Sequence, residues 1–322
     1  MCPNSDLMPT TCVSSLDNVL RAATLSALQG QLNTEGGTVM VPAPPVRRRL
    51  VGRALRRHRE NRGYTLSDAA RVLECHASKL SRIENGERGI RAKELRELLA
   101  EYGIGGEQLE ILTQLADPRG AFGWHRDYDD LLHGAWKDYL LLETAAARIW
   151  TYEAQRIPAL LQTPAYARAL ADADPALKDE AGRDRAVEAV VARQQAILVE
   201  QQPEVHLVVG QAGLHQQVGR PEVMTAQLRR LAEAGSDGGN VTIQILPFEA
   251  GPNPAAAEGS LSILQLTGTA GLGLVHLGGI AGGVCLEGRA DLVAYTTAFD
   301  QLRARAHSSA QSALLLRGLA RG

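Results

Sequence analysis

Cysteine and aromatic residues are scarce in this chain of 322 residues. Its four cysteines are scattered and form no C-x-x-C pair, which argues against a disulfide framework and against a cysteine-rich zinc site. No run of roughly 18 apolar residues occurs, so we expect no membrane span, and Met1 to Leu20 has no secretory signature. These absences lead us to expect a reducing, cytoplasmic setting.

Motifs of common catalytic sites are also missing. There is no G-x-S-x-G, and the glycines between Gly271 and Gly283 form neither G-x-G-x-x-G nor a phosphate loop, so they predict hairpin-like turns. His125, Asp127, Asp129, Asp130 and His133 could surround a metal ion, but they occur in a predicted linker without a helical H-x-x-x-H. We therefore expect no enzyme, no catalytic residues, no cofactor and no metal site.

Charge is present but unevenly distributed. The formal net charge is −2. The segment from Val46 to Tyr102 contains 15 basic and 8 acidic residues, a net of +7, whereas the remainder contains 19 and 28, a net of −9. A basic module joined to an acidic body is typical of a nucleic-acid reader that carries a second domain.

The basic segment has the periodicity of an all-α domain at 46–117. Apolar spacing predicts helices over 47–61, 66–73, 77–85, 92–102 and 107–117. Thr65 followed by Asp68 predicts a capping box for the second helix. The adjacent Ala69 and Ala70 allow close helix packing. Together these features predict a helix-turn-helix.

The third predicted helix has the polar face that a recognition helix needs. Leu80 and Ile83 are kept for the core, and the other positions are polar or small. Lys and Arg favour guanine O6 and N7 in the major groove. The residues predicted to contact bases are Ala77, Ser78, Lys79 and Arg82.

Phosphate contacts are predicted around that helix. The first helix, together with Arg62 directly after it, carries eight arginines against a single Glu60, and the start of the second helix offers unpaired N–H groups to anions. The predicted phosphate-binding residues are Arg56, Thr65, Ser67, Ser81, Asn85 and Arg88. Glu84 is expected to pair with an arginine of the scaffold, since phosphates repel a carboxylate. The alternative is a basic helical bundle that contacts protein.

The rest of the chain is predicted to be a tail, a linker and a second domain. We expect a disordered extension at 1–45, with a marginal helix near 18–32 and Met40 as the native start, and a linker at 118–135. An α+β domain is expected at 136–318 with four to five strands. Its predicted helices are 139–155, 164–172, 183–202, 221–234, 289–305 and 308–317, and its strands 205–209, 241–246, 260–266, 274–277 and 283–286.

Two motifs carry a resemblance to known families. Residues 48–103, with Ser78-Lys79-Leu80-Ser81-Arg82-Ile83-Glu84-Asn85-Gly86, resemble the XRE (Cro/phage-repressor) helix-turn-helix family. The region beyond is similar to the DUF5753 domain of WhiJ-like, antitoxin-like actinobacterial regulators. The matching runs are 142–146, Ile157-Pro158-Ala159-Leu160-Leu161-Gln162-Thr163-Pro164-Ala165-Tyr166-Ala167, 193–194, 224–228 and 245–251.

The resemblance implies a transcriptional regulator, such as a repressor, that binds double-stranded DNA as a homodimer and has a small DUF397-type partner protein. An antitoxin-like module that sequesters this partner remains the alternative. The chain departs from the family by losing carboxylates at 210–214 and 275–278, and by placing His76 where a serine usually caps the third helix. Trp124, Trp136, Trp150, Tyr152 and Tyr166 could instead line a ligand pocket, but packing of helix against linker is the commoner explanation for such a cluster.

Overall fold

The structure is a computed structural model that describes residues 44–117, 123–235, 239–266, 271–279 and 282–321. The predicted N-terminal extension, its marginal helix and Met40 lie almost wholly outside these residues. Within the described residues, no helix is both long enough and apolar enough to cross a membrane.

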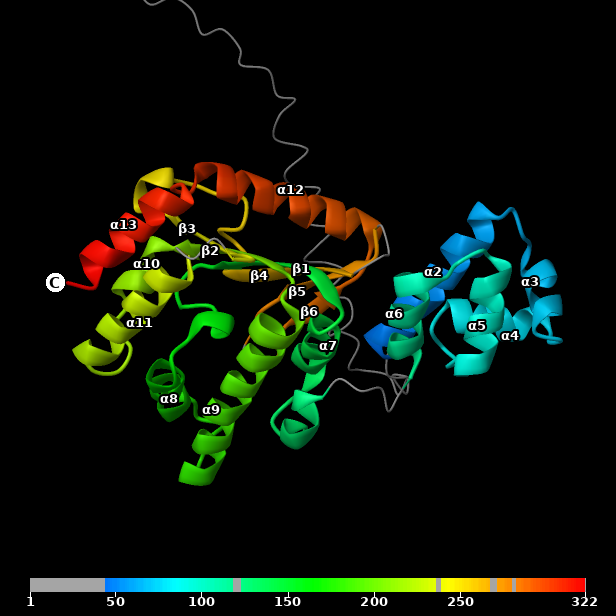
Figure 1. Cartoon of the computed structure of the whole chain (residues 1–322), viewed down its shortest axis with the longest axis horizontal. Coiled ribbons are helices and arrows are strands. Elements are labelled where there is room, and N and C mark those ends of the chain that lie inside the picture. The colour runs from blue at the N-terminus through cyan, green and yellow to red at the C-terminus, as the bar shows by residue number, and fades with distance from the viewer. Residues whose placement is uncertain (1–43, 118–122, 236–238, 267–270, 280–281, 322) are drawn as a thin grey trace, which may run out of the picture. The chain divides into compact units, whose positions relative to one another are not determined.

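The basic segment forms the predicted helices over the described residues 44–117. They are α2 (Val46–Asn61), α3 (Leu66–Val72), α4 (Ala77–Glu84), α5 (Ala92–Glu101) and α6 (Gly106–Ala116), with most ends within one residue of the prediction (Figure 1). Their buried faces form one core, which contains Leu50, Leu55, Leu80, Ile83 and Leu98. The all-α prediction for this region is confirmed.

Small residues bring these helices close together. Gly52 of α2 lies against the backbone at the end of α4, where an added Cβ would come within 2.6 Å of the Ile83 carbonyl oxygen. Ala69 and Ala70 of α3 are buried, as the sequence predicted. The α3–α4 turn passes through Glu74, whose φ of 47° lies in the left-handed region that favours glycine. The Cys75 N–H donates to the Ala70 carbonyl oxygen at 3.0 Å and closes this turn.

The region after 136 contains a mixed sheet of six strands within the described residues, one more than expected. They are β1 (Ala146–Glu153), β2 (Glu204–Gly210), β3 (Val241–Leu246), β4 (Ser260–Leu266), β5 (Gly273–Leu277) and β6 (Val284–Leu286). The order is β3-β2-β1-β4-β5-β6. The pairs β1–β2 and β2–β3 are parallel, and the others are antiparallel.

The predicted helix over 139–155 is wrong. Helix α7 ends at Glu143, and Ala146–Glu153 is the central strand β1, paired on both sides. The alanines at 145–147 suggested a helix, but Ile149 to Tyr152 are β-branched or aromatic residues that suit a strand. A strand buried on both faces lacks apolar–polar alternation, so its period does not appear in the sequence.

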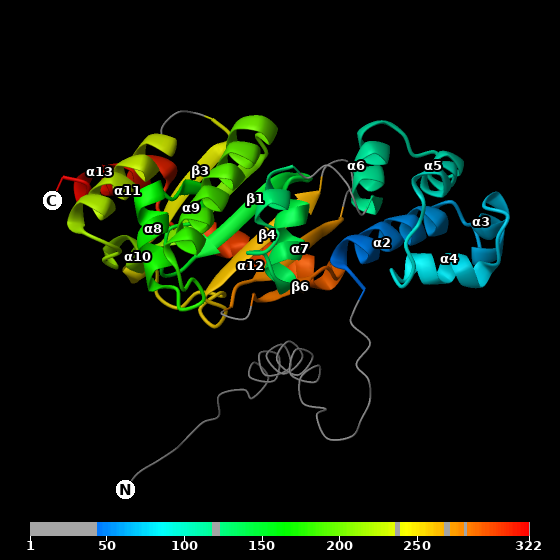
Figure 2. The ribbon, with the colours of Figure 1, turned by 90° about the horizontal axis from the view of Figure 1, so that it is seen from below.

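Helices cover both faces of the sheet. Outside the strands, the described helical elements are η1 (Trp124–Tyr128), α7 (Gly134–Glu143), η2 (Ala159–Leu161), α8 (Pro164–Ala173), α9 (Glu180–Gln194), η3 (Gln195–Gln201), α10 (Gln211–His215), α11 (Pro221–Ala234), η4 (Phe248–Ala250), α12 (Arg289–Arg305) and α13 (Ser309–Leu319). Helix α12 lies along one face, whereas α7, α8 and α9 lie on the other (Figures 1 and 2). Trp150 packs on Phe299 of α12, and Ile149 belongs to the opposite cluster.

Candidate nucleic-acid interface

Helix α4 separates its apolar and polar residues as the sequence predicted. Leu80 and Ile83 are buried. Ser78, Arg82 and Asn85 are exposed, while Lys79 is half-buried. A short helix that grips a core on one side and presents hydroxyl, guanidinium and amide groups on the other has the chemistry of major-groove readout.

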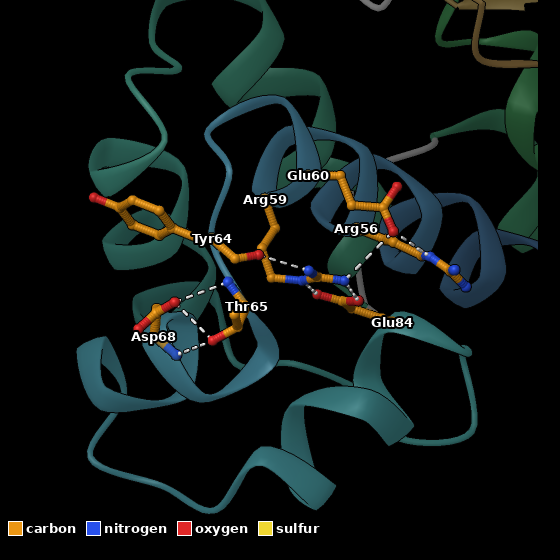
Figure 3. Close-up of polar contacts among 7 residues, drawn as sticks. All are labelled: Arg56, Arg59, Glu60, Tyr64, Thr65, Asp68 and Glu84. Atoms are coloured by element: carbon orange, nitrogen blue, oxygen red, sulfur yellow. Dashed lines mark hydrogen bonds and ion pairs between the residues drawn. The ribbon is translucent and has the colours of Figure 1, made fainter.

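The start of α3 is capped by its own carboxylate. The Thr65 hydroxyl accepts from the Asp68 N–H at 3.1 Å, and Asp68 Oδ2 accepts from the Thr65 N–H at 2.9 Å, so the predicted capping box is confirmed (Figure 3). The Thr65 hydroxyl also donates to Asp68 Oδ2 at 2.6 Å, and this hydrogen bond, followed by those from the Thr65 N–H and Arg71, lowers the pKa of Asp68. A phosphate at this helix start would meet the charged carboxylate of Asp68. The exposed Ser67 is better placed to donate a hydrogen bond to that phosphate than Thr65, because the Thr65 hydroxyl is bonded to Asp68.

Helix α4 begins without a side-chain cap. The N-cap residue of α4 is His76, and its side chain makes no capping hydrogen bond. This agrees with the weaker cap expected for histidine at this position. The first N–H groups of α4 therefore lack a partner from this side chain, next to the exposed Ser78.

Lys79, one of the predicted base-contacting residues, is held by an acidic neighbour. Its ammonium forms an ion pair with Glu94 of α5, and the hydrogen bond from Lys79 is the main cause of the lowered pKa of Glu94. Glu94 also accepts from the Arg91 N–H at the start of α5. Lys79 must leave this pair before it can contact a base, whereas the Arg82 guanidinium of the same helix, among the described residues, donates only to the Ser78 carbonyl oxygen, at 3.3 Å.

The remaining predicted contact residues lie in α4, just beyond its end, or in α2. Asn85 and Arg88 are exposed beyond its end, and the Arg88 N–H donates to the Arg82 carbonyl oxygen at 3.1 Å. Ser81 and Ala77 are only partly exposed. Arg56 of α2 is exposed and pairs with Glu60 one turn later at 2.8 Å.

Glu84 fixes α4 to α2, as the sequence analysis expected. Both its carboxylate oxygens accept from Arg59, at 2.7 and 2.9 Å, and the two residues are 5% and 8% exposed (Figure 3). Arg59 also donates to the Tyr64 carbonyl oxygen at 2.8 Å, which secures the approach to α3. The hydrogen bond to Glu84 raises the pKa of Arg59. This ion pair therefore holds the end of α4, and with it the exposed face of the helix, in place against α2.

The arginines of α2 serve the scaffold more than the sequence suggested. Arg49 and Arg53 both form ion pairs with Glu287 of the β6–α12 connection, whose side chain is 7% exposed. Arg62 donates to the Tyr102 carbonyl oxygen at 2.8 Å. Arg59 is also buried, so at least four of the eight arginines contact other parts of the protein. Their partners Glu287 and Tyr102 are distant in sequence, and nothing local in the sequence indicated them.

The acidic and histidine residues of the linker are dispersed among other contacts. Asp129 pairs with Lys137 at 2.6 Å, and Asp130 pairs with Arg185 at 2.6 Å. In the part of the chain that the structure describes, no group of three His, Cys, Asp or Glu residues could hold a metal ion.

The helix order, the tight α3–α4 turn and the polar face of α4 define a helix-turn-helix DNA-binding protein with an attached α+β domain. A family model described as a helix-turn-helix domain matches residues 50–112, and the model for a domain of unknown function, DUF5753, matches residues 136–318. The chain belongs to the DUF5753 family. Neither the comparison with curated proteins nor the comparison with solved structures returned a match.

Proposed function

We propose that the chain is a sequence-specific transcriptional regulator that reads an operator through α4. The main support for the proposal is the structure of α4. The buried Arg59–Glu84 ion pair joins this helix to α2, and Ser78 and Arg82 are exposed on its surface. Ala77 and Lys79 complete the proposed base-contacting set, with Lys79 requiring release from Glu94. Regulation without catalysis fits the absence of catalytic motifs from the sequence.

Phosphate binding is proposed for the residues around this helix. Ser67, Asn85 and Arg88 are exposed, and Arg56 has only an exposed partner that phosphate can replace. Ser81 and Thr65 belong to the same proposed set. These contacts would set register on the duplex without reading sequence.

Replacing Arg82 by alanine should weaken binding to the preferred operator by about 1–3 kcal/mol and relax the preference at one base position. Competition binding against single-base operator variants measures both effects. Arg96 of α5 is exposed and carries the same charge, so Arg96→Ala is the matched control and should retain the base preference. Equal loss on every DNA sequence would contradict base readout by Arg82.

Replacing Arg56 by alanine should weaken binding to all DNA sequences by a similar factor and reduce the slope of log affinity against log salt by about one. The reason is that one phosphate contact, and its released counterion, is lost. Affinity measured over a series of salt concentrations on operator and random DNA checks this. An unchanged salt slope would remove Arg56 from the phosphate-binding set.

Two further parts of the proposal concern partners. We propose a homodimer on two half-sites about one helical turn apart, and a small DUF397-type protein bound by the α+β domain. The support for both is the resemblance to regulators of this kind. Sedimentation of the protein with and without operator DNA tests the dimer, and co-purification with the product of a neighbouring small gene tests the partner.

A further inference from the structure

A pocket of about 520 Å³ lies beside the segment that joins the two matched regions. One wall is η1, which supplies Trp124, Asp127 and Tyr128. The opposite wall is the end of α9 and the η3 segment that continues it, with the end of α7 between them. Of the five aromatic residues that the sequence suggested as a pocket lining, only Trp124 lies here. Of the other four, Trp150, Tyr152 and Tyr166 are buried and Trp136 is partly buried.

The pocket carries negative charge and no positive charge. Asp127 and Glu200 are in its lining, which includes no Lys, Arg or His. The structure gives neither carboxylate an ion-pair partner among the residues it describes. The nearby Arg185 is held by Asp130 at 2.6 Å and by the Asp127 carbonyl oxygen at 2.6 Å. Both carboxylates are exposed, so their charge is available to attract a cationic ligand.

Two aromatic rings complete this environment. The rings of Trp124 and Tyr128 are 6.3 Å apart and inclined at 44°. The indole N–H of Trp124 is buried and has no acceptor among the described residues, although a buried donor normally has one. Aromatic faces next to carboxylates attract organic cations.

The backbone of η3 brings its polar side chains to the pocket. The π-helical segment begins at Gln195 and ends at Gln201. Its residues that line the pocket fall in two pairs five positions apart, 195–196 and 200–201. In an α-helix, residues five apart differ in direction by about 140°. A π-helical turn places them on one side, and such turns are frequent at functional sites. With this π-helical geometry, Glu200 lines the same pocket as Asp127.

We propose that this pocket binds a small organic ammonium ion through the rings of Trp124 and Tyr128 and the carboxylates of Asp127 and Glu200. The proposal goes beyond DNA binding and does not depend on it. Because η1 lies between residues 112 and 136, where the two family matches end and begin, the ligand would contact the segment that joins the two regions.

Calorimetric titration of the full-length protein with choline chloride, at constant ionic strength and without DNA, tests the proposal. The comparison ligand is 3,3-dimethylbutan-1-ol, the neutral carbon analogue of choline. We expect saturable choline binding at millimolar concentrations and at least about fivefold weaker binding of the neutral analogue. The double variant Asp127→Asn/Glu200→Gln should weaken choline binding about tenfold, since each exposed carboxylate contributes a few-fold.

The matched control is Glu222→Gln. Glu222 is an exposed carboxylate of α11 outside the pocket, so this variant should bind choline as the parent does. Circular dichroism verifies that all variants are folded. Equal affinity for choline and its neutral analogue, unchanged binding by the double variant, or no saturable binding of choline would each overturn the proposal. Operator binding is measured separately, so it can succeed or fail independently.

Discussion

Replacing Glu84 by leucine should lower the free energy of unfolding by about 3–5 kcal/mol, because it leaves the Arg59 guanidinium buried without its carboxylate. An arginine cannot escape this cost by losing its proton. Among the described residues, the hydrogen bond to the Tyr64 carbonyl oxygen and the exposed Glu60, 3.6 Å away, would remain near it. Urea unfolding followed by far-ultraviolet circular dichroism measures the change.

The adjacent exposed pair provides the control for this experiment. Arg56 and Glu60 have the same chemistry as Arg59 and Glu84, but their side chains are more than half exposed (Figure 3). Glu60→Leu should change stability by no more than about 0.5 kcal/mol. The double variant Arg59→Met/Glu84→Leu should recover much of the loss, because no charge is then left buried. Similar unfolding midpoints for Glu84→Leu and Glu60→Leu would contradict this account.

The same substitution links the scaffold to DNA binding. Arg59 belongs to α2 and Glu84 is the last residue of α4, so the pair holds the reading helix against the body of the domain. Glu84→Leu should therefore weaken operator binding even under conditions where most molecules are folded. Preserved operator affinity in the destabilised variant would show that the Gly52 contact and the apolar core alone position α4.

The sequence predicted the helices of the DNA-binding region well because their signals are local. Thr65 and Asp68 mark a helix start three residues apart, and Gly63 and Gly86 take the positive φ angles of helix ends. The pairing of Glu84 with an arginine was foreseen from repulsion by phosphate, although the choice of Arg59 among eight candidates depends on helix packing. Strand β1 was missed because it is buried on both faces and lacks the apolar–polar alternation that marks a strand in the sequence.

The candidate site was only partly predictable for the same reason. The polar face of α4 follows from helical periodicity. The engagement of Lys79 by Glu94, and of Arg49 and Arg53 by Glu287, depends on tertiary contacts over 15 to 238 residues of sequence. The lining of the pocket near η1 was not predicted from the sequence either. Glu200 reaches this pocket through a π-helical turn, which the spacing of residues does not indicate.

A second buried ion pair, in the α+β domain, should be as sensitive as the first. Both carboxylate oxygens of Glu143 in α7 accept from Arg193 in α9 at 2.7 Å, and the Tyr139 hydroxyl donates to the same carboxylate at 2.9 Å. Glu143 is 0% exposed, and the Arg193 guanidinium lies 4.9 Å from the ring centre of Trp136. We expect Glu143→Leu to lower the free energy of unfolding by about 3–5 kcal/mol.

The reciprocal change, Arg193→Met, should behave differently with pH. It leaves a buried carboxyl, which can take up a proton and become neutral, whereas the guanidinium left by Glu143→Leu stays charged. Protonation is favoured at low pH, so the loss caused by Arg193→Met should be smaller at about pH 5 than at about pH 8, while that caused by Glu143→Leu should change little. Urea unfolding of both variants and the parent protein at the two pH values measures these differences. Equal losses for Arg193→Met at both values would mean that water or another group reaches Glu143, and that the pair is less isolated than its burial indicates.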